Sequence, residues 1–180
     1  MMPAKIEKLI HGETVFRGKR MAVRVDKVQV DDCKPTIREV VESCNAVAIL
    51  GIDKSNNMIF IRQYRHAVGR ILLELPAGKI DPGESKYMAG LREFKEETGY
   101  TAGSIETLLS GLSSPGFLTE NIHILLATDL TEGNPEPTEN ENIEVVGIPI
   151  PDVLGKIDSG EISCLKSIAA VYAYMVKVLS

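Results

Sequence analysis

The sequence predicts an α+β fold in which a mixed β-sheet carries two helices. Most of the 180-residue chain is divided into short runs rich in β-branched and aliphatic residues, a composition typical of strands. Only residues 85–98 and 163–179 repeat their apolar residues at three and four positions, as an amphipathic helix does. Strands therefore outnumber helices, and the length corresponds to one domain with a small extension.

We expect residues 1–42 to form a small antiparallel β subdomain and residues 43–180 to form the main domain. Apolar and polar residues alternate over 21–30, apart from a slip near Asp26 that suggests a β-bulge. A turn then leads into a second alternating run at 36–42.

The main domain is predicted to contain six strands and both helices. The strands are short apolar runs at residues 46–52, 58–64, 71–75, 105–110, 122–127 and 143–148. The first helix is expected to end before Gly99, since glycine is common just past a helix C-terminus. Ser163 is positioned to cap the second helix.

Charge and hydropathy exclude several classes of partner. With 20 basic and 25 acidic residues the net charge is −5, which disfavours a surface for nucleic acid. The longest nearly apolar stretch, 168–176, is too short to cross a membrane. The first residues show no signal peptide, and three cysteines without metal-like spacing read as reduced thiols. We therefore expect a cytoplasmic protein without nucleic-acid or membrane partners.

Three glutamates are expected on one face of the first helix. Because each helical residue turns 100°, Glu93, Glu96 and Glu97 lie close together around the axis. Such carboxylates repel one another, and a hard divalent cation such as Mg²⁺ or Mn²⁺ would reverse the sign of that interaction. The alternative is a solvated helix face in which Arg92 and Glu96 form an ordinary ion pair.

The spacing around this helix is more specific than the glutamates alone. Gly78 is followed after five residues by Glu84, and after seven more by Arg-Glu-Phe-Lys-Glu-Glu-Thr-Gly at 92–99. This pattern resembles the signature of the Nudix hydrolases over residues 78–100, with Tyr100 in place of the family's usual aliphatic residue.

The resemblance extends over about residues 45–179 and is similar to the ADP-ribose pyrophosphatase branch in particular. The segments that carry it are Arg-Gln-Tyr-Arg at 62–65, Glu-Leu-Pro-Ala-Gly at 74–78 and Ser-Pro-Gly at 114–116. It implies an α/β/α sandwich around a mixed sheet, with an N-terminal antiparallel subdomain exchanged across a homodimer.

The resemblance also implies two to three Mg²⁺ or Mn²⁺ ions. The implied ligands are the Ala77 carbonyl, Glu93, Glu96, Glu97 and Glu141. Arg92 matches an arginine that orients the glutamates, and Glu84 matches a supporting carboxylate.

Four further residues match substrate-binding positions: Arg65 on the diphosphate, and Arg62, Glu74 and Pro115. Each has a simpler interpretation, because arginines can point outward from a strand, a glutamate can be a strand-end charge, and Ser-Pro-Gly makes a good turn. No adenine-stacking aromatic residue is identified, and Phe16 and Arg38 are candidates for contacts.

The acidic segment 139–144 resembles the loop that supplies a general base in this branch. We place Glu139 as the base and Glu141 as an additional metal ligand, with Glu144 as a competing choice. The alternative is a solvated acidic turn.

These features together predict metal-assisted hydrolysis of ADP-ribose to AMP and ribose 5-phosphate. No covalent enzyme intermediate is expected, because the three histidines are scattered and no nucleophilic dyad or triad is evident. Two alternatives stay open: a pyrophosphatase for another nucleoside diphosphate sugar such as GDP-mannose, and a module that senses ADP-ribose without cleaving it. The intact signature disfavours the second.

Overall fold

The computed structural model describes residues 4–135 and 142–179 and divides into two compact units. The first unit is Met1–Cys44 with Leu112–Asn121, and the second is Asn45–Gly111 with Ile122–Ser180. The first unit thus includes a segment from the middle of the chain, which a single boundary in the sequence does not capture. Within the described ranges, no helix is both long and apolar enough to cross a membrane.

The first unit contains a three-stranded antiparallel sheet in the order β1-β2-β3. Its strands are β1 (Lys8–Arg17), β2 (Met21–Gln29) and β3 (Thr36–Ser43). The bulge suggested near Asp26 is not in that strand, because β2 pairs with β3 in unbroken register. The register shifts instead occur on β1, between Leu9 and His11 and between Thr14 and Phe16.

The alternation slips in β2 because a charged residue lies on its buried side. Asp26 is buried, as are Ala22 and Val28 on the same side of the strand. Its carboxylate accepts hydrogen bonds from Nε of Arg24 at 2.8 and 3.0 Å. This ion pair lets an aspartate occupy a position where the pattern predicts an apolar residue.

The second unit is built on a seven-stranded mixed sheet with the order β10-β5-β4-β9-β8, to which β6 and β7 add by pairing with β5 and β4. The strands are β4 (Ala46–Ile52), β5 (Asn57–Arg65), β6 (Arg70–Glu74), β7 (Ala77–Lys79), β8 (Thr101–Leu112), β9 (Asn121–Thr131) and β10 (Ile143–Pro149). The β4–β9 pair is parallel, whereas β5 is antiparallel to β4, β6 and β10.

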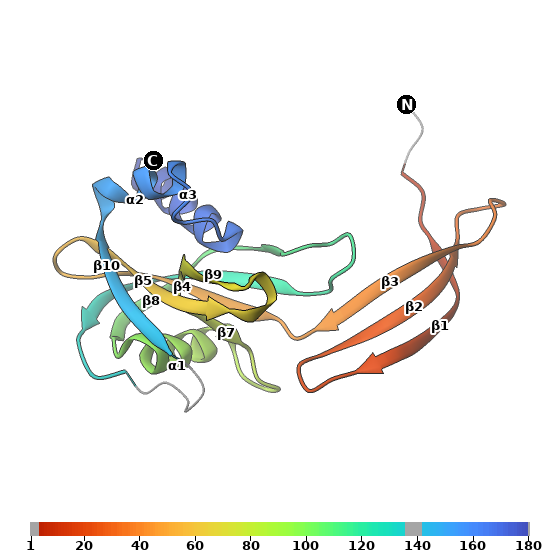
Figure 1. Cartoon of the computed structure of the whole chain (residues 1–180), viewed down its shortest axis with the longest axis horizontal. Helices are drawn as coiled ribbons and strands as arrows, with labels where there is room; N and C mark the ends of the chain where they lie inside the picture. The colour runs from red at the N-terminus through yellow and green to blue at the C-terminus, as the bar shows by residue number, and fades with distance from the viewer. Residues whose placement is uncertain (1–3, 136–141, 180) are drawn as a thin grey trace. The chain divides into compact units, whose positions relative to one another are not determined.

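Helices cover both faces of this sheet (Figure 1). Helix α1 (Lys86–Thr98) packs on one face, and α2 (Ile150–Asp158) and α3 (Leu165–Leu179) pack on the other. Alternate residues of β4 serve the two sides: Ile49 packs with the α1 cluster, and Leu50 with the α2–α3 cluster. The predicted α/β/α arrangement of a mixed sheet is therefore confirmed.

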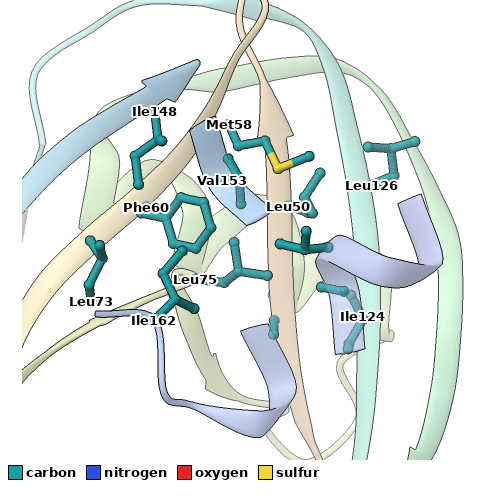
Figure 2. Packing of buried hydrophobic residues seen from close by; sticks show 13 residues of the cluster. Leu50, Met58, Phe60, Leu73, Leu75, Ile124, Leu126, Ile148, Val153 and Ile162 are labelled. Carbon is teal, nitrogen blue, oxygen red and sulfur yellow. The ribbon is translucent and has the colours of Figure 1, made fainter. Parts of the chain in front are cut away.

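The larger cluster lies between the sheet and helices α2 and α3. Figure 2 shows Phe60 of β5 beside Ile162, which precedes α3, and Val153 of α2 near Met58. On the other face, Phe94 of α1 is buried and its ring stacks on Tyr100, with centroids 6.2 Å apart. The aromatic residue at position 100 therefore extends the core under α1.

Three elements have no clear signal in the sequence: β1, β7 and α2. Every residue of β1 is exposed, so its sequence carries no apolar alternation. Strand β7 has only three residues, and α2 has nine, with a proline in its first turn. Short or exposed elements bury too little apolar surface to leave a periodic pattern.

Both ends of α1 follow from local sequence. Ser85 is its N-cap, and its hydroxyl accepts a hydrogen bond from the Met88 amide at 3.2 Å. Gly99 ends the helix in a left-handed conformation, with φ of 78°. The last two turns of this helix carry Glu93 and Glu97, so the caps fix the boundaries of the element that presents them.

We expect Ser85→Ala to lower the free energy of unfolding by about 1 kcal/mol, because the Met88 amide loses its acceptor. Urea denaturation would measure the loss. Ser104→Ala, at an exposed position in β8, is the control and should leave the midpoint nearly unchanged. An equal effect of the two substitutions would contradict the capping role of Ser85.

Candidate active site

Two glutamates of α1 lie against the short segment Ala77–Gly78. Glu97 is only 5% exposed, and its Oε2 accepts a hydrogen bond from the Ala77 amide at 2.9 Å. Glu93 lies over Gly78, so closely that a Cβ at position 78 would overlap its carboxylate. The structure thus brings together three positions that the sequence predicts as metal ligands: residues 77, 93 and 97.

Arg92 binds three carboxylates of this region, those of Glu84, Glu93 and Glu96. Its guanidinium donates two hydrogen bonds of 3.0 Å to Glu84, one of 2.7 Å to Glu93, and a weaker one of 3.4 Å to Glu96. The hydrogen bonds with Glu84 raise the pKa of Arg92 further above its high ordinary value, and those same bonds lower the pKa of Glu84. Arg92 is therefore a fixed cation that orients the acidic cluster.

The atoms of this cluster that could bind a metal are oxygens, and oxygen ligands suit a hard divalent cation. Because Gly78 has no Cβ, the Glu93 carboxylate can lie directly against the backbone at this position. Among residues 4–135 and 142–179, no three acidic, histidine or cysteine side chains already converge on one point. The residues fit a metal held by Glu93 and Glu97 together with backbone oxygen, with Glu96, 41% exposed, nearer the solvent.

A second charged group surrounds Glu74 at the end of β6. Glu74 is 1% exposed, and its Oε1 accepts a hydrogen bond from Nε of Arg65 at 2.5 Å. Its Oε2 is bound by Nζ of Lys166, at the start of α3. Both carboxylate oxygens of Glu74 are bound by protein side chains, and the residue is buried. Arg65 is therefore the member of this pair that is accessible to solvent.

The segment from Glu74 to Ala77 is held at every residue. The Leu75 amide donates to Oγ of Ser167 at 2.9 Å, and both residues are fully buried. The Pro76 carbonyl accepts from the Ile49 amide at 2.9 Å. Through these contacts, β4 and α3 fix the path of the chain from Glu74 to Ala77, which lies against Glu97 of α1.

Burial raises the pKa of Glu74, but the ion pairs with Lys166 and Arg65 outweigh it, so the pKa lies below its ordinary value of 4.5. A carboxyl with a depressed pKa contributes stability that is complete above the unfolded-state pKa and is lost as the pH falls through the folded-state pKa.

We therefore expect Glu74→Gln to destabilise the protein by about 2 kcal/mol at pH 7, since Lys166 and Arg65 lose a buried counterion. The difference from wild type should shrink as the pH is lowered from about 6 to about 3. Urea denaturation across this pH range measures it, with Glu106→Gln, in an exposed ion pair with Lys177, as the control. A difference that is independent of pH would contradict the prediction.

Arg62 and Glu144 are placed away from the α1 glutamates. They are cross-strand partners in β5 and β10 and form an ion pair of 3.0 Å. Arg62 is two residues from Phe60, and Glu144 is two residues from Val146. Residues two apart in a strand share a face, and Phe60 and Val146 belong to the cluster under α2 and α3, so this ion pair lies on the sheet face opposite α1. Arg62 also approaches Glu161 at 3.8 Å. Arg65 is three residues from Arg62 and so points to the opposite face of β5, the face on which Ile59 packs with α1.

The remaining predicted residues fall into two groups. Pro115 and Phe16 are exposed and Arg38 is ion-paired with Glu7, and all three belong to the first unit. Pro115 begins a turn in which the amides of residues 117 and 118 donate to the Ser114 carbonyl. Glu139 and Glu141 lie outside the residues that the structure describes, so both stay predictions.

Lys166 and Ser167 are the residues of this region that the sequence analysis missed. Each lies 92 positions from its partner, so no local spacing links them. The available signal is that polar residues interrupt the apolar pattern at the start of the last helix.

Comparison with known proteins identifies relatives over nearly the whole chain. Residues 43–166 match the model of the NUDIX domain. An ADP-ribose pyrophosphatase of Bacillus subtilis is 35% identical over 95% of this chain and 94% of its own length. An ADP-ribose pyrophosphatase of Mycobacterium tuberculosis is 38% identical over 91% of this chain and 81% of its own length.

One solved structure, described as an ADP compounds hydrolase, shares the fold. It superimposes with a TM-score of 0.88 over 99% of this chain and 97% of its own, at 24% sequence identity.

Proposed function

The chain belongs to the NUDIX family, and on that premise we propose that it hydrolyses the diphosphate bond of ADP-ribose to give AMP and ribose 5-phosphate. The two bacterial relatives are ADP-ribose pyrophosphatases, and the match covers more than nine-tenths of this chain. The single observation that carries the proposal is the placement of Glu93 and Glu97 against Ala77–Gly78.

The chain's own residues have separable roles in this reaction. Glu93, Glu97 and the Ala77 carbonyl would hold a divalent cation, with Glu96 as a further ligand. Arg92 keeps these carboxylates oriented through its contacts with Glu84 and Glu93. A bound divalent cation neutralises the diphosphate and makes the attacking water more acidic.

Arg65 is the residue that we assign to the substrate. Its side chain is 38% exposed, and its guanidinium can donate to two phosphate oxygens while Nε stays on Glu74. Negative charge increases on the departing phosphate during the reaction, and a fixed guanidinium stabilises it. Glu139 is our proposed base, and Glu141 our proposed additional ligand, from the sequence alone.

Mg²⁺ or Mn²⁺, two to three ions, is the proposed cofactor, since oxygen donors dominate the site. Location in the cytoplasm and assembly as a homodimer also stay predictions of the sequence. Sedimentation of the purified protein tests the dimer, and cell fractionation tests the location.

The proposal is tested by hydrolysis assays with ADP-ribose, GDP-mannose and other nucleoside diphosphate sugars in the presence of Mg²⁺. Products are separated by chromatography as nucleoside monophosphate and sugar phosphate. Release of AMP from ADP-ribose that disappears with EDTA and in Glu97→Gln supports the proposal. Preference for another nucleoside diphosphate sugar would change the substrate and leave the metal site unaffected. Binding of ADP-ribose without turnover would overturn the catalytic assignment.

A further inference from the structure

We propose that Lys166 is a positioning residue for the substrate's diphosphate, because it neutralises Glu74 and so leaves the terminal nitrogens of Arg65 to bind phosphate. The inference deepens the proposed function and rests on it, since it requires a diphosphate substrate. Lys166 itself is not placed in contact with the substrate.

The geometry divides the two oxygens of Glu74 between two cations. Oε1 is bound by Nε of Arg65 at 2.5 Å, and Oε2 is bound by Nζ of Lys166. Lys166 is fixed in turn by a contact of 3.1 Å with Sγ of Cys164. Its side chain is 16% exposed, so its charge is directed to the carboxylate and away from bulk solvent.

Among the residues that the structure describes, Arg65 forms a hydrogen bond through one of its three guanidinium nitrogens, Nε. Within the described part of the chain, Nη1 and Nη2 of Arg65 make no hydrogen bond to a protein group. These two groups are the ones that bind phosphate oxygens in a bidentate manner. The contact through Nε therefore fixes the plane of the guanidinium and leaves its donors available.

The charge of the group depends on Lys166. With both cations present, the negative charge of Glu74 is neutralised. Arg65, Glu74 and Lys166 together keep a net charge of about +1, which attracts a diphosphate. Without Lys166, Glu74 and Arg65 would form a neutral pair. The released Oε2 would also compete for a second nitrogen of Arg65, because a carboxylate and a guanidinium favour a two-point contact. Both effects weaken phosphate binding.

We expect Lys166→Met to raise KM for ADP-ribose about tenfold while kcat changes less than about threefold, because the diphosphate is charged in both the ground state and the transition state. Lys166→Arg keeps the cation and should restore KM to within about threefold of wild type. Lys177→Met is the matched control. Lys177 is also on α3 and also forms an ion pair, with Glu106, and its loss should leave KM unchanged.

A double-mutant cycle with Glu74 shows whether Lys166 acts through that carboxylate. In the Glu74→Gln background there is no carboxylate to compete for Arg65, so Lys166→Met should raise KM less than about threefold, which is the part due to the lysine's charge alone. Thermal denaturation of each variant is recorded alongside the kinetics. An unchanged KM in Lys166→Met overturns the inference. An equal effect of Lys166→Met with and without Glu74 also overturns it, because the lysine would then support the fold alone.

The proposed function and this inference fail in different ways. If the wild-type protein hydrolyses no nucleoside diphosphate sugar, the proposed function fails, and the same variants are titrated with ADP by calorimetry. Weaker ADP binding in Lys166→Met, with recovery in Lys166→Arg, then supports the positioning role. Equal ADP binding in all variants, or none in the wild type, overturns it.

Discussion

Replacing Glu93 with glutamine is expected to lower kcat for ADP-ribose about 1000-fold, which corresponds to about 4 kcal/mol of lost transition-state stabilisation. Glutamine has nearly the same size and can still accept a hydrogen bond from Arg92. The substitution therefore removes a negative charge from the position over Gly78 and changes little else. Initial rates at saturating ADP-ribose and Mg²⁺ give the measurement.

The control for this prediction is Glu106→Gln, a substitution of the same kind in an exposed ion pair on β8. It should leave kcat unchanged, and the melting temperature of Glu93→Gln should stay within a few degrees of wild type. Full activity of Glu93→Gln would remove Glu93 from the metal site. A matching loss in the control would show that the assay reports general charge effects.

Gly78→Ala is expected to lower kcat about 100-fold with little loss of stability. The new Cβ would overlap the Glu93 carboxylate, which must move. That carboxylate is the end of a flexible side chain, so the displacement costs little folding energy, whereas a metal ligand displaced by about 1 Å costs about 100-fold in rate. Kinetics and thermal denaturation of the same sample separate the two effects.

Gly155→Ala is the matched control for this second prediction. A Cβ at position 155, in α2, would meet no atom within 4 Å outside its own helix backbone and chain neighbours, so the activity of Gly155→Ala should equal that of wild type. Activity of Gly78→Ala near the wild-type level would contradict the placement of Glu93. Loss of activity together with a large fall in melting temperature would show that residue 78 supports folding of β7, which is a different role.

The positions of the α1 glutamates could be predicted from the sequence, because the helical repeat is a local property. Glu93 and Glu97 lie one turn apart, and Ser85 and Gly99 mark the ends of their helix. The approach of Gly78 could not be derived locally, because it depends on the pairing of β7 with β4. The resemblance to a known family implied only that the Ala77 carbonyl joins the glutamates at a metal site, and it did not include a contact of Gly78 with Glu93.

The two arginines of β5 show that the alternation of side chains along a strand separates residues that lie close together in the sequence. Arg62 and Arg65 are three residues apart, so an extended strand places them on opposite faces. The family resemblance assigned both to the substrate, and the sequence alone does not reveal which face α1 covers. The structure pairs Arg62 with Glu144 under α2 and α3, and leaves Arg65 on the side of the sheet that α1 covers.

Anchoring of Glu74 and Leu75 by α3 has a consequence for synthesis of the protein. Lys166 and Ser167, which hold Glu74 and Leu75, belong to the last helix, whereas Arg65 and the glutamates of α1 are encoded much earlier. A nascent chain whose last helix is still inside the ribosome has the glutamates of α1 but lacks the support for the end of β6. We therefore expect full hydrolytic activity only after that helix has left the ribosome.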